Sequence, residues 1–186
     1  NQWCCWKLED IGAKKPTKIP YNPLNGQLCS VTNPTTYCSF ADAVSYSSGY
    51  SGIGFIFTDN DPFTFIDLDN TEGDNTALER QIKIHQEFDS YSEVSPSGKG
   101  LHIIIRGSIP AGRRRSYIEV YSSQRYATMT GQVYNKKSIE YRQEQLTQLW
   151  EQMGGSPVTV NFTGEDKESY TDEQIIEQAT NAVNGE

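Results

Sequence analysis

Short apolar runs in the middle of the chain predict a set of β-strands. Ile53–Phe57 and Phe63–Asp69 flank the turn-forming residues 58–62, a pattern that predicts an antiparallel hairpin. Three further runs predict strands at 101–105, 118–121 and 126–130.

Helical spacing appears on both sides of these runs. Ser39 followed by Asp42 predicts a capped helix start, with an apolar face of Phe40, Ala43 and Val44. A second helix is predicted over about 76–89, with Leu78, Ile82, His85 and Phe88 on one side. A third is predicted from Ser138 to about Met153, with Leu146, Leu149 and Trp150 as its apolar side chains.

The two ends of the chain differ from its middle. Residues 1–38 are rich in Pro, Asn, Thr and Gly and predict irregular structure. Residues 154–170 predict a linker, and Thr171 with Gln174 predicts the capped start of a last helix. The sequence therefore predicts an α+β domain over 1–153 and an acidic tail over 154–186.

Charge separates the same two parts. Residues 1–150 carry 16 acidic and 15 basic side chains, whereas residues 151–186 carry eight acidic residues and one Lys. The net charge of −8 thus lies mostly in the tail, and DNA binding by the body is not excluded.

Hydropathy and cysteine usage bear on location. No apolar run approaches the roughly 20 residues of a membrane span, and no leader pattern is visible at the start, so a cytoplasmic protein is expected. The four cysteines have neither zinc-knuckle nor disulfide-framework spacing. Small buried side chains in a reducing compartment are the expectation, with a zinc site or a disulfide as alternatives.

Three acidic residues stand at strand positions. Asp67 and Asp69 are two residues apart, which places both carboxylates on one face of a strand, and Glu119 lies between Ile118 and Val120 in another. Adjacent carboxylates repel unless a cation neutralises them, and oxygen ligands suit Mg²⁺ or Mn²⁺. The alternatives are a strand with one solvated face for the pair and a solvated strand residue for Glu119.

A loop of small residues precedes the strand at 101–105. Ser95 to Gly100 offers hydroxyls, Lys99 and flexible backbone N–H groups that could approach a phosphate, but it lacks the glycine spacing of a Walker A loop. His102 follows, and a lone His in an apolar strand is more often a core residue.

In order, the motifs FIDLD, SPSGKGLH, YIEVY and RYATMTG resemble the catalytic domain of the archaeo-eukaryotic primase superfamily. The likeness is greatest to the primase-polymerase domains of phage and plasmid replication proteins. It covers roughly Trp3 to Gly131 and includes TKIPYNP and TNPTTY near the start. The resemblance implies an RRM-like mixed or antiparallel sheet beside a second small αβ module, with the active site between them.

The resemblance also implies roles for individual residues. Asp67, Asp69 and Glu119 would bind two Mg²⁺ or Mn²⁺ ions. His102, with Ser97, Gly98 and Lys99 of the loop, would hold a dNTP or NTP, and Arg125 would be a further phosphate ligand. We expect Tyr126 to pack against the sugar and favour deoxynucleotides, with a core tyrosine as the equal alternative.

The implied activity is nucleotidyl transfer to a 3′-hydroxyl on a DNA template-primer. A fused or separate helicase is the expected partner, and a monomer is the default. The chain lacks the cysteine cluster of some members, and its tail does not resemble a helicase, so extension of a primer is predicted and de novo priming is left open.

Three other functions deserve comparison. FIDLDNT also matches the opening motif of haloacid-dehalogenase-type phosphatases, which need a parallel sheet. A non-catalytic nucleic-acid-binding module would not need the three acids. A nicking nuclease would need paired histidines, whereas the chain has only His85 and His102. Arg113 to Arg115 predict either a contact to template phosphates or a solvated loop.

Overall fold

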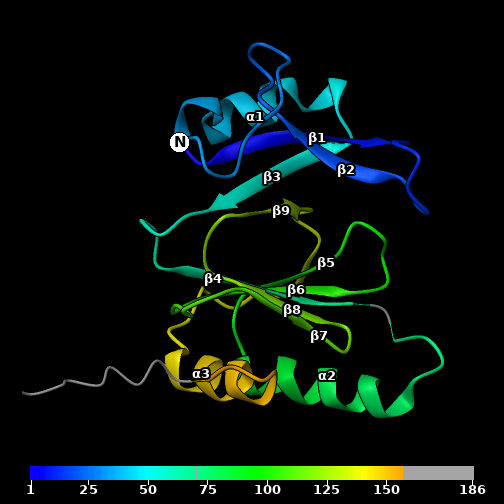
Figure 1. Cartoon of the computed structure of the whole chain (residues 1–186), viewed down its shortest axis with the longest axis vertical. Coiled ribbons are helices and arrows are strands. Elements are labelled where there is room, and N and C mark those ends of the chain that lie inside the picture. Colours follow the sequence, from blue (N-terminus) through cyan, green and yellow to red (C-terminus); the bar gives the residue numbers. More distant parts are fainter. Residues whose placement is uncertain (70, 157–186) are drawn as a thin grey trace, which may run out of the picture. The chain divides into compact units, whose positions relative to one another are not determined.

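The computed structural model describes residues 1–69 and 71–156 and places their strands in two antiparallel sheets. One sheet has four strands in the order β2-β1-β3-β9, and the other has six in the order β10-β5-β6-β4-β8-β7. Figure 1 shows α2 and α3 on one face of the six-stranded sheet and β9 and β3 on the other. The predicted α+β class is confirmed.

The four-stranded sheet consists of β1 (Trp3–Glu9), β2 (Thr17–Tyr21), β3 (Gly52–Phe57) and β9 (Arg125–Met129). The prediction that residues 1–38 are irregular is therefore wrong. Cys4, Cys5 and Trp6 are all buried, so β1 lacks the alternation that reveals a half-exposed strand. β2 lies at the edge of its sheet, where its Pro20 is tolerated.

The six-stranded sheet consists of β4 (Phe63–Leu68), β5 (Ser92–Val94), β6 (Leu101–Arg106), β7 (Arg113–Arg115), β8 (Ile118–Tyr121) and β10 (Val133–Asn135). The predicted hairpin of 53–57 with 63–69 is wrong, because β3 and β4 belong to different sheets. The intervening turn carries the chain from one sheet to the other. β1 and β9 occupy the edges of β3, and β6 and β8 occupy those of β4.

Three α-helices and two 3₁₀ turns complete the described part. They are α1 (Phe40–Tyr46), α2 (Asn75–Phe88), α3 (Gln143–Gln152), η1 (Pro34–Thr36) and η2 (Ser47–Gly49). The capping box of Ser39 and Asp42 at α1 is confirmed, but only Ala43 of its predicted apolar face is buried.

The buried face of α2 differs from the predicted one. Ala77, Gln81, Ile84 and Phe88 are buried, whereas Leu78 and Ile82 are about half exposed. α3 begins five residues later than predicted because the preceding segment runs beside the end of β6, where the Arg106 N–H donates to the Glu140 carbonyl at 2.8 Å. Its predicted apolar side chains are buried as expected.

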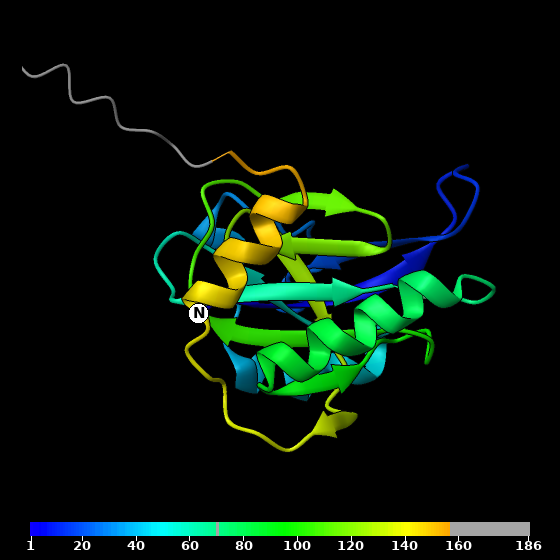
Figure 2. The same ribbon diagram turned by 90° about the horizontal axis from the view of Figure 1, so that it is seen from below.

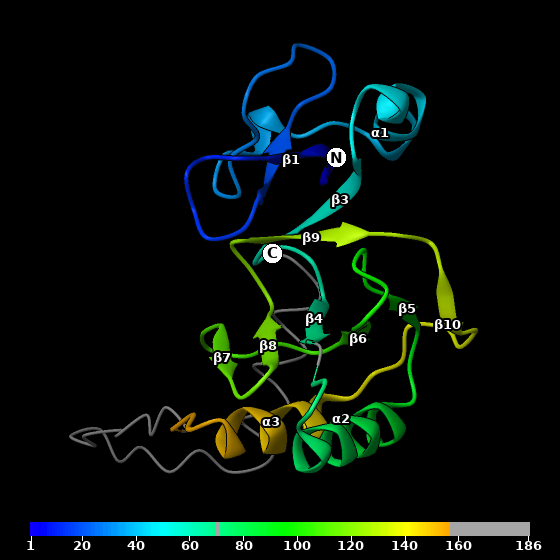
Figure 3. The same ribbon diagram turned by 90° about the vertical axis from the view of Figure 1, so that its right-hand side faces the viewer.

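The main core lies between the six-stranded sheet and α2 and α3, which lie in front of the sheet in Figure 2 and below it in Figure 3. Aliphatic side chains from β4, β6 and β8 meet the two helices there; the strand residues are Ile66, Leu68, Ile103, Ile105, Ile118 and Val120. Along each strand, the residues between these core residues point to the face of the sheet away from the helices.

The remaining predictions on organisation have mixed outcomes. The four cysteines are buried and unpaired by disulfides, as the small-side-chain interpretation expects. No helix among the described residues is long and apolar enough to cross a membrane. The helix predicted from Thr171 and most of the predicted linker lie outside the described residues.

Candidate active site

Three adjacent strands bring the predicted residues together on the sheet face away from the helices. On β4, Asp67 stands opposite His102 of β6 on one side and opposite Glu119 of β8 on the other. Residues directly opposite each other in antiparallel strands project to the same face. The Nε2 of His102 lies 3.8 Å from an Asp67 oxygen.

Asp69 follows the last residue of β4 and is held through its backbone. Its N–H donates to the Tyr117 carbonyl at 2.9 Å, and its own carbonyl accepts from Gln81 of α2 at 3.0 Å. Its negative charge contributes to raising the pKa of Asp67.

The electrostatics of Asp67 reflect this crowding. Burial, together with the charges of Asp69 and Glu119, raises the pKa of Asp67 to about 6 against the opposing effect of His102 and Lys18. A carboxyl group in this environment is stabilised as an anion by a nearby cation.

Glu119 is buried and has two cationic partners. The Nη2 of Arg125 lies 2.8 Å from one carboxylate oxygen, and the Nε of Arg114 lies 3.1 Å from the other. Arg125 belongs to β9, so this ion pair joins the two sheets, and its guanidinium also lies 4.4 Å from the centre of the Tyr121 ring. The structure thus brings Arg125 to the acidic residues.

Whether the site fits a divalent cation depends on its donors and on their present partners. Three carboxylates on one surface are the donor type that Mg²⁺ and Mn²⁺ prefer. Within 1–69 and 71–156, however, no three His, Cys, Asp or Glu side chains are gathered closely enough to hold a metal as they stand. The donors fit, whereas both oxygens of Glu119 face arginines.

The loop from Ser95 to Gly100 lies beside Asp69. The Ser95 hydroxyl accepts from the Gly100 N–H at 3.1 Å and lies 3.0 Å from the Ser97 hydroxyl, while Gly98 takes a positive φ of 73°. A Cβ on Gly100 would stand 2.6 Å from the Leu68 carbonyl oxygen, so only glycine lets the loop approach the end of β4 this closely.

Lys99 projects from the same loop and is mostly exposed. Its ammonium lies 3.3 Å from a carboxylate oxygen of Glu72, in the segment that follows β4. Ser97, Gly98 and Lys99 therefore belong to a loop that contacts the end of β4 through Gly100, next to the backbone of Asp69.

Sequence reasoning missed Glu93, which is fully buried on β5. It accepts hydrogen bonds from the N–H groups of Thr130 and Gly131, each at 2.9 Å, and lies 3.3 Å from the Nδ1 of His102. Although burial alone would raise it, these donors hold the pKa of Glu93 below its ordinary value. With Nδ1–H donating to Glu93, the Nε2 of His102 is directed at Asp67.

The sequence contains one feature that could have indicated Glu93. It is an acid between two residues of a strand-like run, Ser92 and Val94, and it repeats the pattern of Glu119. The run is three residues long in the structure, too short to stand out in the sequence.

Tyr126 is placed differently from the other predicted residues. It follows Arg125 on β9 and packs against a cluster that includes Cys4, Tyr37 and Ile56, while its hydroxyl donates to the Lys18 carbonyl. Strand alternation directs it away from the side chain of Arg125. Contact of Tyr126 with a sugar stays a prediction.

The arginine run forms strand β7, so the alternative of a solvated loop at 113–115 is wrong, and contact with template phosphates stays a prediction. Alternation separates its side chains: Arg114 reaches Glu119, whereas Arg113 lies 4.8 Å from the centre of the Trp150 ring on α3. Pairing with β8, which sequence pattern alone does not reveal, creates this division.

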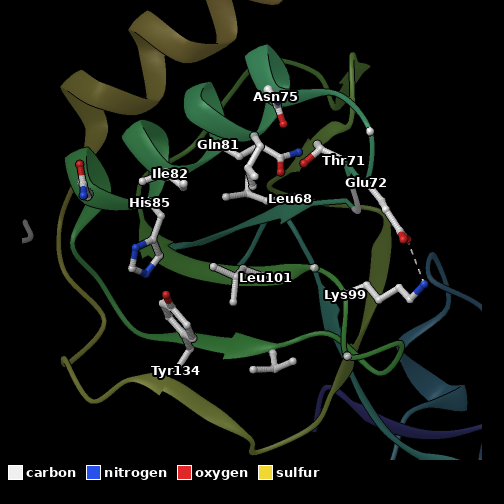
Figure 4. Close-up of a pocket in the computed structure, with 16 residues that line it drawn as sticks. Leu68, Thr71, Glu72, Asn75, Gln81, Ile82, His85, Lys99, Leu101 and Tyr134 are labelled. Atoms are coloured by element: carbon white, nitrogen blue, oxygen red, sulfur yellow. Dashed lines mark hydrogen bonds and ion pairs between the residues drawn. The ribbon is translucent and has the colours of Figure 1, made fainter.

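A cavity of about 480 Å³ lies on the helix side of the six-stranded sheet, beneath the loop (Figure 4). Its floor includes Leu68 and Leu101, and His85 and Tyr134 stand edge to face with ring centres 5.1 Å apart. His85 is thus on the opposite face from His102, and the pair required by a nicking nuclease is absent from the chain.

β4 pairs antiparallel with both neighbours, so the sheet is not the parallel sheet that a haloacid-dehalogenase-type phosphatase needs.

No family model matches the chain. A DNA primase-polymerase of Nitratiruptor phage NrS-1 is 40% identical over 147 residues, a match that covers 72% of this chain. The chain spans about a fifth of that protein's length. On this match, the chain belongs to the phage-type primase-polymerase family.

Proposed function

We propose that this chain is the catalytic part of a phage DNA primase-polymerase that adds nucleotides to a 3′-hydroxyl on a DNA template. The observation that carries the proposal is the row of Asp67, His102 and Glu119 across three strands, with a Ser/Gly loop beside it. The name of the phage relative supports the same activity.

Asp67, Asp69 and Glu119 would hold two Mg²⁺ or Mn²⁺ ions. Bound ions would lower the pKa of the primer hydroxyl and neutralise the triphosphate and the leaving pyrophosphate. The protein's part is to place these carboxylates at fixed positions on a rigid sheet, since phosphoryl transfer depends mainly on positioning and charge neutralisation.

The triphosphate would lie between His102 and the loop. Backbone N–H groups near Gly98, the hydroxyl of Ser97 and the ammonium of Lys99 are donors suited to phosphate oxygens. Arg125 would add a planar guanidinium, and Glu93 would keep His102 in one orientation. Tyr126 would contact the sugar only through a change in its present packing.

We infer further that the six-stranded sheet is the RRM-like module of the family and the four-stranded sheet its companion. Two helices cover one face of the first sheet, and the acidic residues lie on the face toward β9. A helicase, fused or separate, is the partner that we propose for the whole protein, which would act as a monomer in the host cytoplasm.

Primer extension tests the activity. The full chain is incubated with a labelled primer-template, dNTPs or NTPs, and Mg²⁺ or Mn²⁺, beside an Asp67→Ala/Asp69→Ala variant. Asp59→Ala, in an exposed turn, is the matched control. We expect extension by the wild type and the control and none by the double variant; a primer-free reaction then tests priming.

A non-catalytic nucleic-acid-binding module is the remaining alternative. It would bind primer-template without extending it under any metal, and the double variant would bind as well as the wild type. That outcome would refute the proposed function while leaving the family assignment intact.

A further inference from the structure

Glu119 has two partners that compete with any metal ion. Arg125 and Arg114 approach different oxygens of its carboxylate, at 2.8 and 3.1 Å. A carboxylate paired in this way is neutralised and has little need of another cation. Before Glu119 can coordinate a divalent ion, at least one guanidinium must leave.

The two arginines differ in how firmly they are held. Arg125 lies on β9, a strand paired over five residues with β3, and its guanidinium also contacts the Tyr121 ring. Arg114 lies on β7, a three-residue strand at the edge of the sheet. Its side chain is 71% exposed, against 46% for Arg125.

Arg114 also has space into which it can move. Its side chain lines an open cavity of about 600 Å³ that Asp69 and Arg80 line as well. Arg80 is tethered there through a hydrogen bond of 2.6 Å to the Ser116 carbonyl. Because the guanidinium of Arg114 is mostly exposed, solvent screens its ion pair with the buried Glu119, and the pair restrains a long side chain.

We propose that Arg114 is an exchangeable counter-ion of Glu119. It occupies one oxygen of the carboxylate while no divalent cation is bound and leaves that oxygen when a cation binds, whereas Arg125 stays at the other oxygen. The inference rests on the proposed function, because it takes Asp67, Asp69 and Glu119 as the metal-binding carboxylates.

Direct metal binding tests this exchange without any need for polymerase activity. Mn²⁺ affinity of the full chain is measured by isothermal titration calorimetry and by electron paramagnetic resonance of free Mn²⁺, without DNA or nucleotide. Arg114→Ala removes the competitor, and we expect Mn²⁺ to bind about two- to fivefold more tightly, the range that an exposed ion pair corresponds to. Arg114→Lys keeps the charge but loses the planar guanidinium, so we expect a smaller gain.

Two arginines serve as matched controls. Arg115→Ala removes a charge from the neighbouring position of β7, and Arg80→Ala removes one from the same cavity; neither has an ion pair with Glu119 among those of the described residues. We expect both to leave Mn²⁺ affinity near that of the wild type. An equal gain in either control would show a general field effect and overturn the exchange.

Asp67→Asn separates this inference from the function on which it rests. If Asp67→Asn abolishes Mn²⁺ binding but Arg114→Ala leaves it unchanged or weaker, the metal site stands and the exchange is wrong. If Mn²⁺ binding is indifferent to Asp67→Asn, the cation binds elsewhere, and both the exchange and the proposed metal site fail. Thermal melts establish that each variant is folded.

Discussion

The two faces of the six-stranded sheet are built from the same strands yet have opposite chemistry. Toward α2 and α3, β4, β6 and β8 present mainly aliphatic side chains, which form the main core. Toward β9 they present Asp67, His102 and Glu119 in one row. Side chains alternate between the two faces of a strand, so the same strands can bury an apolar core on one face and hold a group of charged side chains on the other. The helix-facing side thus stabilises the fold, and the opposite side holds the candidate site.

The largest expected effect is on primer extension and comes from a substitution on the polar face of the sheet. Asp67→Asn should reduce primer extension about 1000-fold, since a metal-bound carboxylate contributes several kcal/mol to transition-state stabilisation. The fold should persist, because this substitution removes a buried charge without changing the volume. Steady-state extension and urea unfolding on the same sample measure both quantities; comparable loss in Asp59→Ala would contradict a role specific to the site.

The opposite face should respond in stability. Ile103→Ala removes a fully buried side chain beneath His102 and should lower the free energy of unfolding by about 2–5 kcal/mol. Urea denaturation is the measurement, and Ile11→Ala, at a 59% exposed position, is the control. An unfolding free energy within the error of the control would mean that this core is not what holds the sheet together.

Glu93 tests whether the polar face also contributes to stability. Its pKa is lowered in the folded chain, so its contribution is present above its ordinary value of 4.5 and is lost as the pH falls through the lower folded value. Glu93→Gln should lower the unfolding free energy at pH 7 by about 1–3 kcal/mol. Relative to this variant, the wild type should lose its advantage in melts recorded from pH 5 down to pH 3.

A pH-independent difference between wild type and Glu93→Gln would show that Glu93 acts by packing alone. Glu140→Gln is the control, because it replaces a carboxylate that lies away from Asp67, His102 and Glu119. Its unfolding free energy shows how much pH dependence the loss of one such carboxylate causes.

The smallest expected effect concerns the end of β4, where the loop at Gly100 approaches the strand. Gly100→Ala would place a methyl group 2.6 Å from the Leu68 carbonyl oxygen and push the loop away from Asp69. We expect nucleotide affinity to fall roughly tenfold, equivalent to about 1.4 kcal/mol. Gly49→Ala, which like Gly100 has no positive φ but has open surroundings, is the control for replacing a loop glycine, and equal effects in both would exclude the contact with Leu68 as the cause.

Local signals in the sequence predicted much of the element set. The runs at 101–105 and 118–121, the loop before His102 and the capping box at Ser39 each depend on neighbours a few residues apart, and the structure has all of them. The same locality explains the errors: strand β1 is buried on both sides and shows no alternation, and the partner of β3 cannot be read from the turn that follows it.

Thus the sequence by itself identified the candidate site residues, because Asp67, Asp69 and Glu119 stand out as acids within apolar strands. Only the tertiary structure decided what each of them meets. Strand register, set by long-range pairing, placed His102 and Glu119 on either side of Asp67. The same strand pairing places Glu93 beside His102 and Arg114 beside Glu119. No local sequence pattern specifies which strands pair in this way.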